Sequence, residues 1–207
     1  MKTQSVIIIM LIAFSSFFLY QCKEGNSSES NKTKDTTVAQ NKYGGFANEV
    51  AYGKHLVQIS GCNDCHTPKK MTAMGPVLDT TLLLSGHPAA IPVFDINRKE
   101  IESKGLAVTN DMTTWVGPWG ISYSANLTPD STGVGNWNEA QFFRAIREGK
   151  WMGLEGNRQL LPPMPWQEIG KMKDDELRAV FAYLKSIPRV HNIVPPPAPP
   201  VAAPRHG

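Results

Sequence analysis

Apolar residues recur at helical spacing in three separate stretches of the chain. In the first stretch Phe46, Val50, Gly53 and Val57 follow one another at intervals of three or four residues, which predicts an amphipathic helix. A glycine inside a helix costs about 1 kcal/mol relative to alanine. We therefore expect Gly53 to mark a close crossing with another helix.

The last of these stretches predicts a helix from Asp174 or Asp175 to about Ile187. Acidic residues at its start complement the helix dipole, and Pro188 ends it. Its apolar stripe consists of Leu177, Val180, Phe181 and Leu184. This helix is the expected partner of the crossing at Gly53.

The middle stretch begins with a capping signature. Asn138 and Gln141 have the spacing of a helix cap and its reciprocal partner. The helix that follows carries the apolar residues Phe142, Phe143 and Ile146 and is expected to end at Gly149.

Between the first two helices lies a long segment without helical periodicity, the 59 residues from Thr67 to Ala125. A loop of this length with no structure of its own would be unusual in a compact domain. From Ala107 to Val116, β-branched residues flank Asn110 and Asp111, and this pattern predicts a small hairpin.

The two ends of the chain are expected to take no part in the fold. Lys2 precedes an apolar run from Val6 to Tyr20, which is too short to span a membrane and is typical of a secretory signal. The following LYQC sequence resembles the lipobox of bacterial lipoproteins, which makes Cys22 a candidate lipid anchor. The alternatives are an ordinary signal peptide and an uncleaved anchor. We therefore assign residues 1–21 to a lipoprotein-like signal peptide, residues 22–42 to a flexible polar tether, residues 43–193 to the folded domain, and residues 194–207 to a proline-rich extended tail.

Composition narrows the class of protein further. The 207 residues include only three cysteines, 41% are hydrophobic, and the net charge is +3. These values fit one globular domain and exclude a disulfide scaffold or a multi-pass membrane protein. No basic run exceeds two residues, so we expect no nucleic-acid partner.

The candidate chemistry lies in CNDCH, which contains Cys62, Cys65 and His66. Two thiols at this spacing can add to the vinyl groups of a haem, and the adjacent imidazole then serves as an axial iron ligand. Two alternatives use the same residues: a thioredoxin-like redox pair and half of a zinc site. The redox pair leaves His66 unexplained, and the zinc site needs two further ligands at close spacing, whereas the remaining cysteine is Cys22 in the signal region.

Longer stretches around this motif resemble a known family. Residues 46–66, FANEVAYGKHLVQISGCNDCH, are similar to the first helix and haem motif of class I c-type cytochromes. The segments GPWG, SANLTPD, TGVGNWNEAQFFRAIREGK, LLPPMPW and DDELRAVFAYLKSIPRVHN resemble the monohaem cytochrome domains found beside bacterial dehydrogenases and oxidases. The resemblance covers about half of the chain. It implies an all-α fold, a cytochrome c-like bundle of three or more helices around one covalently bound haem c, with residues 67–125 as an insertion.

The sixth iron ligand is expected to be Met164. The resemblance places the distal methionine in LLPPMPW, where prolines 162, 163 and 165 stiffen an extended loop. Met112, Met152 and His87 are the competitors, whereas His55, His191 and His206 are expected to be solvated.

The insertion could have a function, as a lid or a partner-binding surface at the haem edge. The preferred interpretation is that it is a simple elaboration of the fold. Trp119, Asn126 and Trp166 are candidates to line the haem or to bond a propionate, although packing alone explains them nearly as well.

These observations predict an electron carrier rather than an enzyme. Ligation by His66 and Met164 leaves no open position for a substrate. The expected function is single-electron transfer between a dehydrogenase and a terminal acceptor, by a carrier acting alone or as the cytochrome subunit of an oxidoreductase. Its expected location is the periplasmic or cell-surface side of a bacterial membrane. The alternative is a haem enzyme or gas sensor whose sixth coordination site opens.

Overall fold

The computed structural model describes residues 42–201. The predicted signal peptide, Cys22 and nearly all of the predicted tether lie outside the described residues. No helix within 42–201 has the length and apolar character needed to cross a membrane.

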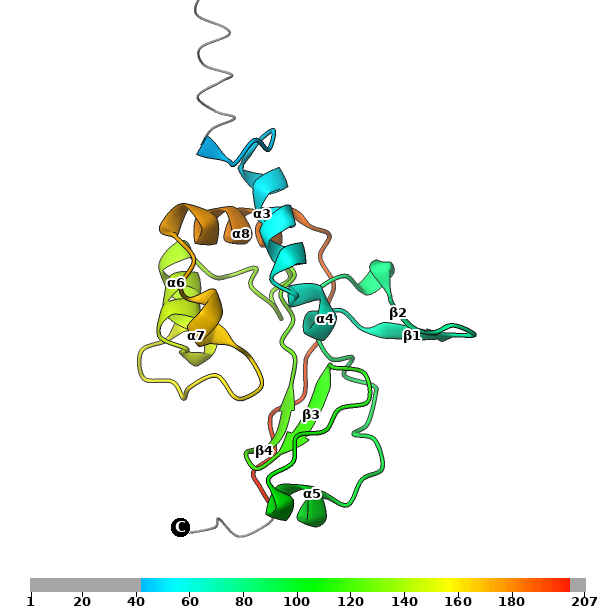
Figure 1. Cartoon of the computed structure of the whole chain (residues 1–207). Helices are drawn as coiled ribbons and strands as arrows, with labels where there is room; N and C mark the ends of the chain where they lie inside the picture. The colour runs from blue at the N-terminus through cyan, green and yellow to red at the C-terminus, as the bar shows by residue number, and fades with distance from the viewer. Residues whose placement is uncertain (1–41, 202–207) are drawn as a thin grey trace, which may run out of the picture. The chain divides into compact units, whose positions relative to one another are not determined.

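Helix α3 (Glu49–Ile59) crosses helix α8 (Asp174–Ser186) at close range (Figure 1). The Asn48 side chain caps α3 by accepting a hydrogen bond from the amide of Ala51 at 2.9 Å. A methyl group at Gly53 would come within 1.8 Å of the carbonyl oxygen of Ala179, so only glycine permits this approach. The predicted crossing is therefore confirmed. The predicted stripe differs in two respects. Phe46 lies before the helix, and Val50 is 38% exposed, whereas Leu56 is buried in addition to Gly53 and Val57.

Helix α6 (Glu139–Arg147) begins with the predicted capping box. Asn138 Oδ1 accepts from the Gln141 amide at 2.9 Å, and Gln141 Oε1 accepts from the Asn138 amide at 3.1 Å. Gly149 follows the helix with a φ of +65°, a conformation that favours glycine. The short helix α7 (Trp166–Ile169) packs against α6.

The core lies between α3, α6 and α8 and the segments that connect them. Its buried members are Leu56, Val57, Leu84, Val134, Phe142, Ile146, Leu177, Ala179, Val180, Tyr183, Leu184 and Ile187. Cys62 and Met164 are half-buried side chains packed against this cluster. The residues of the haem motif and of the LLPPMPW loop therefore meet at one core.

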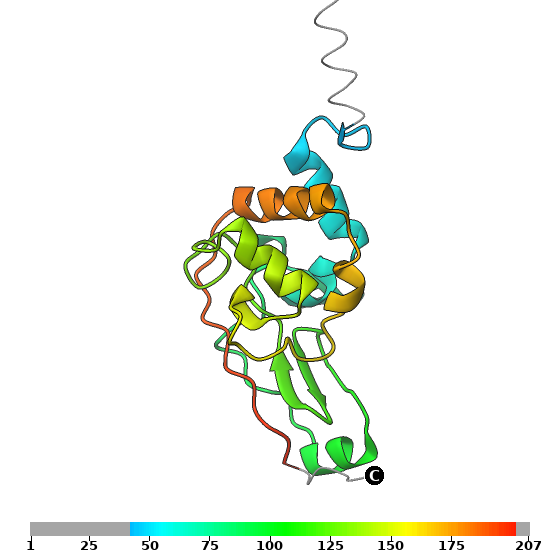
Figure 2. The same cartoon turned by 90° about the vertical axis from the view of Figure 1, so that its left-hand side faces the viewer.

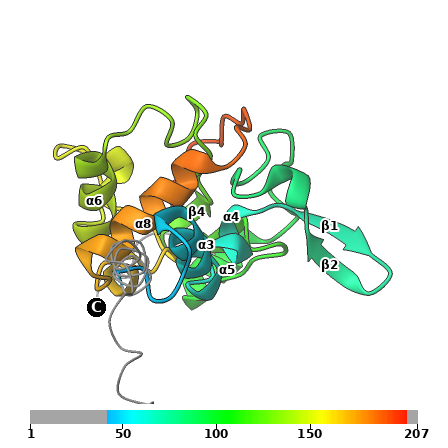
Figure 3. The same ribbon diagram turned by 90° about the horizontal axis from the view of Figure 1, so that it is seen from above.

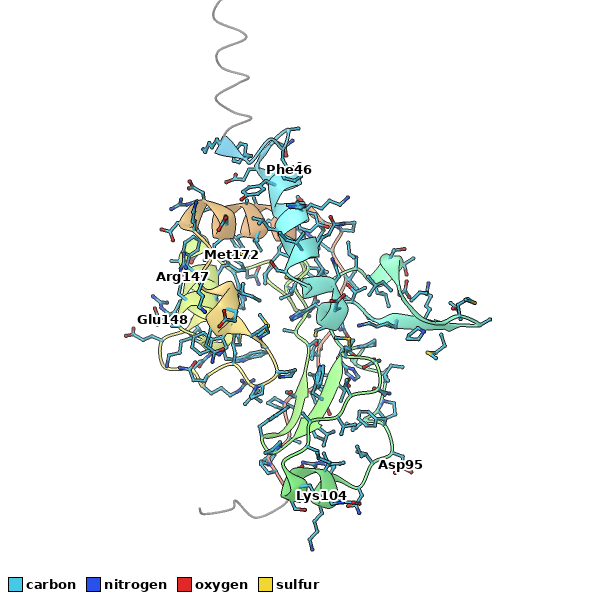
Figure 4. The ribbon with its side chains drawn as sticks, in the orientation of Figure 1. Phe46, Asp95, Lys104, Arg147, Glu148 and Met172 are labelled. Carbon is cyan, nitrogen blue, oxygen red and sulfur yellow. The ribbon has the colours of Figure 1, made fainter. Side chains whose placement is uncertain are left out.

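The chain between α4 (Cys62–His66) and α6 holds two antiparallel hairpins and the helix α5 (Arg98–Lys104). Strands β1 (Lys69–Thr72) and β2 (Gly75–Leu78) form a hairpin that projects away from the helices (Figure 3). The surfaces at the two ends of the folded domain carry Phe46, just before α3, and Lys104, in α5 (Figure 4). The predicted bundle of at least three helices is present, and within residues 42–201 it is accompanied by these hairpins, so the description all-α applies to the bundle only.

The second hairpin is not where the sequence placed it. Strands β3 (Thr114–Gly117) and β4 (Gly120–Tyr123) turn at Pro118 and Trp119. The expected hairpin between Ala107 and Val116 is present only as one antiparallel pair, in which Val108 and Val116 exchange two backbone hydrogen bonds of 2.9 Å. The reason is local: the Asp111 carboxylate accepts from the Thr113 amide at 2.8 Å, and this side-chain cap forms a wide loop instead of a two-residue turn.

The proline-rich segment after Ile193 is extended, but it is not free. It runs beside β4 (Figure 2), and Ala198 exchanges two backbone hydrogen bonds with Ile121, of 2.8 and 3.1 Å. Arg98 donates to the carbonyl of Pro199 at 2.7 Å. The expectation that this end takes no part in the fold is therefore wrong as far as Val201, and the later residues lie outside the described part of the chain.

Candidate functional site

Helix α4 places the two thiols of the CNDCH motif together. Cys62 and Cys65 are three residues apart on one short helix, so their side chains share a face. Both are free and half-buried. Gly61 precedes the helix with a φ of +69° and lets the chain turn from α3 directly into α4. This arrangement presents two sulfur atoms side by side, as attachment to two vinyl groups requires.

Burial raises the pKa of Cys62 to about 11 and also raises the pKa of Cys65. Both thiols are therefore protonated near neutral pH in the chain alone. Redox-active pairs have a thiol with a lowered pKa, so these values disfavour the thioredoxin-like alternative. The zinc alternative lacks partners in the described residues, where no group of three potential metal-binding side chains occurs.

His66 is held in a single orientation. Its side chain is 8% exposed, and Nδ1 donates to the carbonyl oxygen of Ala125 at 2.7 Å. Burial lowers the pKa of His66, which keeps the imidazole neutral. Because Nδ1 carries the proton, the lone pair is on Nε2. This is the arrangement in which histidine binds a metal, with the second nitrogen fixed by a backbone carbonyl.

The LLPPMPW loop places Met164 against the same core as Cys62. The competing methionines are more exposed: Met112 is 37% exposed and Met152 is 43% exposed. Burial therefore favours Met164 among the three methionines weighed from the sequence.

His87 is buried away from solvent, but neither of its ring nitrogens is available. Nε2 donates to the carbonyl of Ile91 at 2.9 Å, and Nδ1 accepts from the hydroxyl of Thr114 at 2.8 Å. Of the histidines expected to be solvated, His191 is exposed and lies 3.3 Å from an Asp130 oxygen, whereas His55 is half-buried and stacks on Phe46, with ring centroids 4.6 Å apart. His206 lies outside the described residues.

The three candidate haem-lining residues are occupied by other contacts. The Asn126 amide donates to Thr132 and to the carbonyl of Val190, and its oxygen accepts from Thr128, so it ties the chain together. The Trp119 indole donates to Ser122 at 3.0 Å. The Trp166 ring lies against Gly149, where a methyl group would come within 2.4 Å of it. These contacts agree with the packing explanation, and a role in lining the haem stays a prediction.

Sequence reasoning missed the partners of the site. The carbonyl of Ala125 orients His66, and the hydroxyl of Ser122 donates to the carbonyl of Pro162 at 2.6 Å, two residues before Met164. Any residue type supplies a carbonyl, so the sequence contains no signal for the first partner. A lone serine in a strand is equally uninformative for the second.

This donor set fits covalently attached haem c. Two neighbouring thiols, a neutral imidazole with its lone pair on Nε2, and a thioether at the same core supply the attachment points and both kinds of axial donor. Fold and site together define a small helical domain built for one attached haem.

Comparison with known proteins identifies the family of this haem-binding domain. The family model for cytochrome c matches residues 50–188, more than half of the chain, and the protein therefore belongs to the cytochrome c family. Members of this family bind haem c covalently, and so does this chain.

The similar proteins are subunits of bacterial dehydrogenases, most of them cytochrome subunits. A nicotinate dehydrogenase subunit of Pseudomonas putida is 40% identical over 79 residues, which are 38% of this chain and 6% of that protein. The cytochrome c subunit of the quinone alcohol dehydrogenase of Gluconobacter oxydans is 26% identical over 147 residues, 70% of this chain and 22% of that protein. The fructose dehydrogenase cytochrome subunit of Gluconobacter japonicus is 37% identical over 68 residues, 32% of this chain and 13% of that protein. This chain thus spans less than a quarter of the length of these relatives, whose names support electron transfer.

Proposed function

We propose that this protein is an exported monohaem carrier of single electrons. In this proposal Cys62 and Cys65 hold haem c through thioether bonds, and His66 and Met164 are the axial iron ligands. Haem bound in this way supplies a one-electron ferrous/ferric couple. The remaining chemistry belongs to the chain, which fixes the ligands and excludes water.

The observation that carries the proposal is the preset orientation of His66. The hydrogen bond to Ala125 fixes the tautomer and the ring plane of His66, which directly follows two thiols on one helix face. A ligand that is held in one orientation loses little entropy on binding. Fixed ligands on both sides of the iron leave no position for a substrate, which favours electron transfer over catalysis.

The proposed donor is a dehydrogenase, and the proposed acceptor is an oxidase or a further cytochrome. Support comes from the relatives, which are named as subunits of dehydrogenases. Those relatives are much longer, so the proposed role of this chain is that of a single cytochrome domain, which carries electrons and leaves substrate oxidation to a dehydrogenase.

Export and membrane attachment belong to the same proposal. The apolar run from Val6 to Tyr20 and the LYQC sequence support a signal with a lipid-modified Cys22. Labelling cells with a fatty acid tests this directly: the full chain should incorporate the label, and Cys22→Ser should not. Incorporation of the label into both the unmutated chain and Cys22→Ser, or into neither, would contradict lipid modification of Cys22.

The haem ligands are tested by the spectrum of the full chain, purified from cells that attach haem. The oxidised protein should show the weak near-infrared band of methionine sulfur on ferric haem, and Met164→Ala should lose it. Met172→Ala is the matched control, since Met172 also packs against the core and should leave the band in place.

Two results would contradict the proposal. Pigment extracted by acid acetone would show that the haem is not covalently bound. Carbon monoxide binding by the unmutated ferrous protein would show an open sixth position, which is the property of the haem enzyme or gas sensor.

A further inference from the structure

Strand β4 and the residues that follow it contact both sides of the candidate site. Ser122 Oγ donates to the carbonyl of Pro162 in the Met164 loop, at 2.6 Å. Three residues later, the Ala125 carbonyl accepts from His66 Nδ1 at 2.7 Å. An extended chain covers about 10 Å in three residues. One short segment therefore reaches from the loop that carries Met164 to the ring of His66.

The bond from Ser122 is important because the Met164 loop has few hydrogen bonds of its own. Prolines 162 and 163 have no amide hydrogen to donate. Within residues 42–201, the hydrogen bond from Ser122 is the one that links residues 161–164 to any other segment, whereas the Met164 amide bonds back to Leu161 inside the loop. The polar attachment of this loop therefore depends on one hydroxyl.

The hydroxyl of Ser122 is itself fixed. Its side chain is 7% exposed, and its oxygen accepts from the Trp119 indole at 3.0 Å, which leaves its hydrogen to be donated to Pro162. The Trp119 ring is held against Gly117, where a methyl group would come within 2.5 Å of the ring.

The strand that carries Ser122 is held along both edges. Ser122 lies opposite Trp115 of β3 in the ladder, and the neighbouring Ile121 pairs with Ala198 of the proline-rich segment. A loop tied to such a strand cannot drift without breaking a partly buried hydrogen bond, which would leave the hydroxyl of the buried Ser122 without its acceptor.

We propose that the segment from Ser122 to Ala125, which begins in β4, is a brace shared by the two axial ligands, and that Ser122 is a positioning residue that holds the Met164 sulfur at the iron through the Pro162 carbonyl. The inference rests on the proposed function, because it requires Met164 to be the distal ligand. It assigns the insertion a role, which is to keep a weak thioether ligand bound when stronger donors compete for its place.

The test is a pH titration of the near-infrared band in the full chain with haem attached. As the pH rises, amines lose their protons and hydroxide becomes more abundant. Both can then displace methionine from ferric iron. Ser122→Ala should lower the midpoint of this loss by about one pH unit, a tenfold change in the exchange equilibrium, because one hydrogen bond contributes on that order. Ser122→Thr keeps the hydroxyl and should restore the midpoint.

Ser85→Ala is the matched control. Ser85 is also a buried serine, and its hydroxyl donates to a backbone carbonyl, that of Leu82, at 2.8 Å. This variant should leave the midpoint unchanged. An equal shift in Ser85→Ala and Ser122→Ala would overturn the proposal, since the effect would then reflect general loss of stability.

A second variant keeps the test decisive if Ser122→Ala does not fold. Trp119→Phe removes the indole donor to Ser122 together with part of the ring system that packs against Gly117, and it should lower the midpoint in the same direction by a smaller amount. An unchanged midpoint in Ser122→Ala, or in Trp119→Phe when it stands alone, overturns the proposal. If the unmutated protein lacks the methionine band, the ligand assignment in the proposed function fails instead, so the two failures are distinguishable.

Discussion

At the scale of single residues, the missing side chain of Gly53 sets the distance between α3 and α8. The position that a methyl group would take lies 1.8 Å from the carbonyl oxygen of Ala179, which belongs to the backbone and cannot turn aside. The helix must therefore move before any larger residue fits.

We expect Gly53→Ala to lower the free energy of unfolding by about 2 kcal/mol. Alanine gains about 1 kcal/mol in helix propensity, but separating two packed helices costs more. Urea unfolding of the full protein measures the change. Lys54→Ala, next to it on the exposed side of α3, is the control and should have little effect. Equal stability of Gly53→Ala and the unmutated protein would show that the crossing adapts.

The residues of the site differ in how far the sequence reveals them. Cys62, Cys65 and His66 stand in a motif whose spacing follows from the chemistry, and the structure places both thiols on one helix face. Their roles as haem attachment points and axial ligand, and that of Met164, stay predictions until they are tested. Ala125 had no sequence signal, because its contribution is a backbone carbonyl brought from 59 residues away.

At the scale of elements, the β1–β2 hairpin projects from the domain and is fastened at its base by Asp79. The Asp79 carboxylate accepts from the Thr81 amide at 3.0 Å and its hydroxyl at 2.6 Å, and it lies 2.9 Å from Lys70 Nζ in β1. Hydrogen bonds from Thr81 and then from Lys70 lower the pKa of Asp79 below its ordinary value. The ionised form is therefore the one that the fold stabilises.

This lowered pKa gives a pH dependence with a definite sign. The stabilisation is complete above the ordinary carboxyl pKa, at which the unfolded chain titrates, and it is lost as the pH falls through the lower value of the folded protein. Asp79→Asn should reduce the melting temperature at neutral pH, and the difference from the unmutated protein should shrink as the pH falls below about 4.

Melting curves between neutral pH and about pH 3 test this expectation. Asp95→Asn is the control, because Asp95 is an exposed carboxylate for which no hydrogen bond or ion pair is found within residues 42–201 (Figure 4). A difference for Asp79→Asn that stays constant with pH would show that the charge plays no part.

The helices were more predictable than the hairpins, for physical reasons. Helix α6 carries its own start signal in Asn138 and Gln141, and α8 has a continuous apolar stripe, so local sequence was sufficient. The β1–β2 hairpin has exposed residues on both faces and thus no alternation of buried and exposed positions to detect. The turn at Pro118 and Trp119 was missed because Asn110 and Asp111 carry a stronger turn signal, which the structure uses for a side-chain cap.

At the scale of the whole molecule, the segment after Ile193 closes the insertion. It pairs Ala198 with Ile121, and it brings Pro199 to Arg98 and the Val201 amide to Glu102. Its composition predicted an extended chain but contained no information on what lies beside it, because these partners are about 80 to 100 residues distant in sequence.

Removal of residues 194–207 should lower the free energy of unfolding by about 2 kcal/mol, because four hydrogen bonds are lost while the entropy of ordering the segment is regained. Urea unfolding and hydrogen exchange at the Ile121 amide measure the effect. Removal of residues 202–207 alone leaves all four bonds and is the control. Equal loss in both truncations would assign the effect to the final six residues instead.

The pairing of Ile121 with Ala198 also sets an order of events in biogenesis. A nascent chain cannot form this pair until Ala198 has been synthesised, 77 residues after Ile121. The cysteines at 62 and 65 emerge long before that point. Strand β4 therefore gains its outer neighbour only after Cys62 and Cys65 have been exposed during the synthesis of more than 130 further residues.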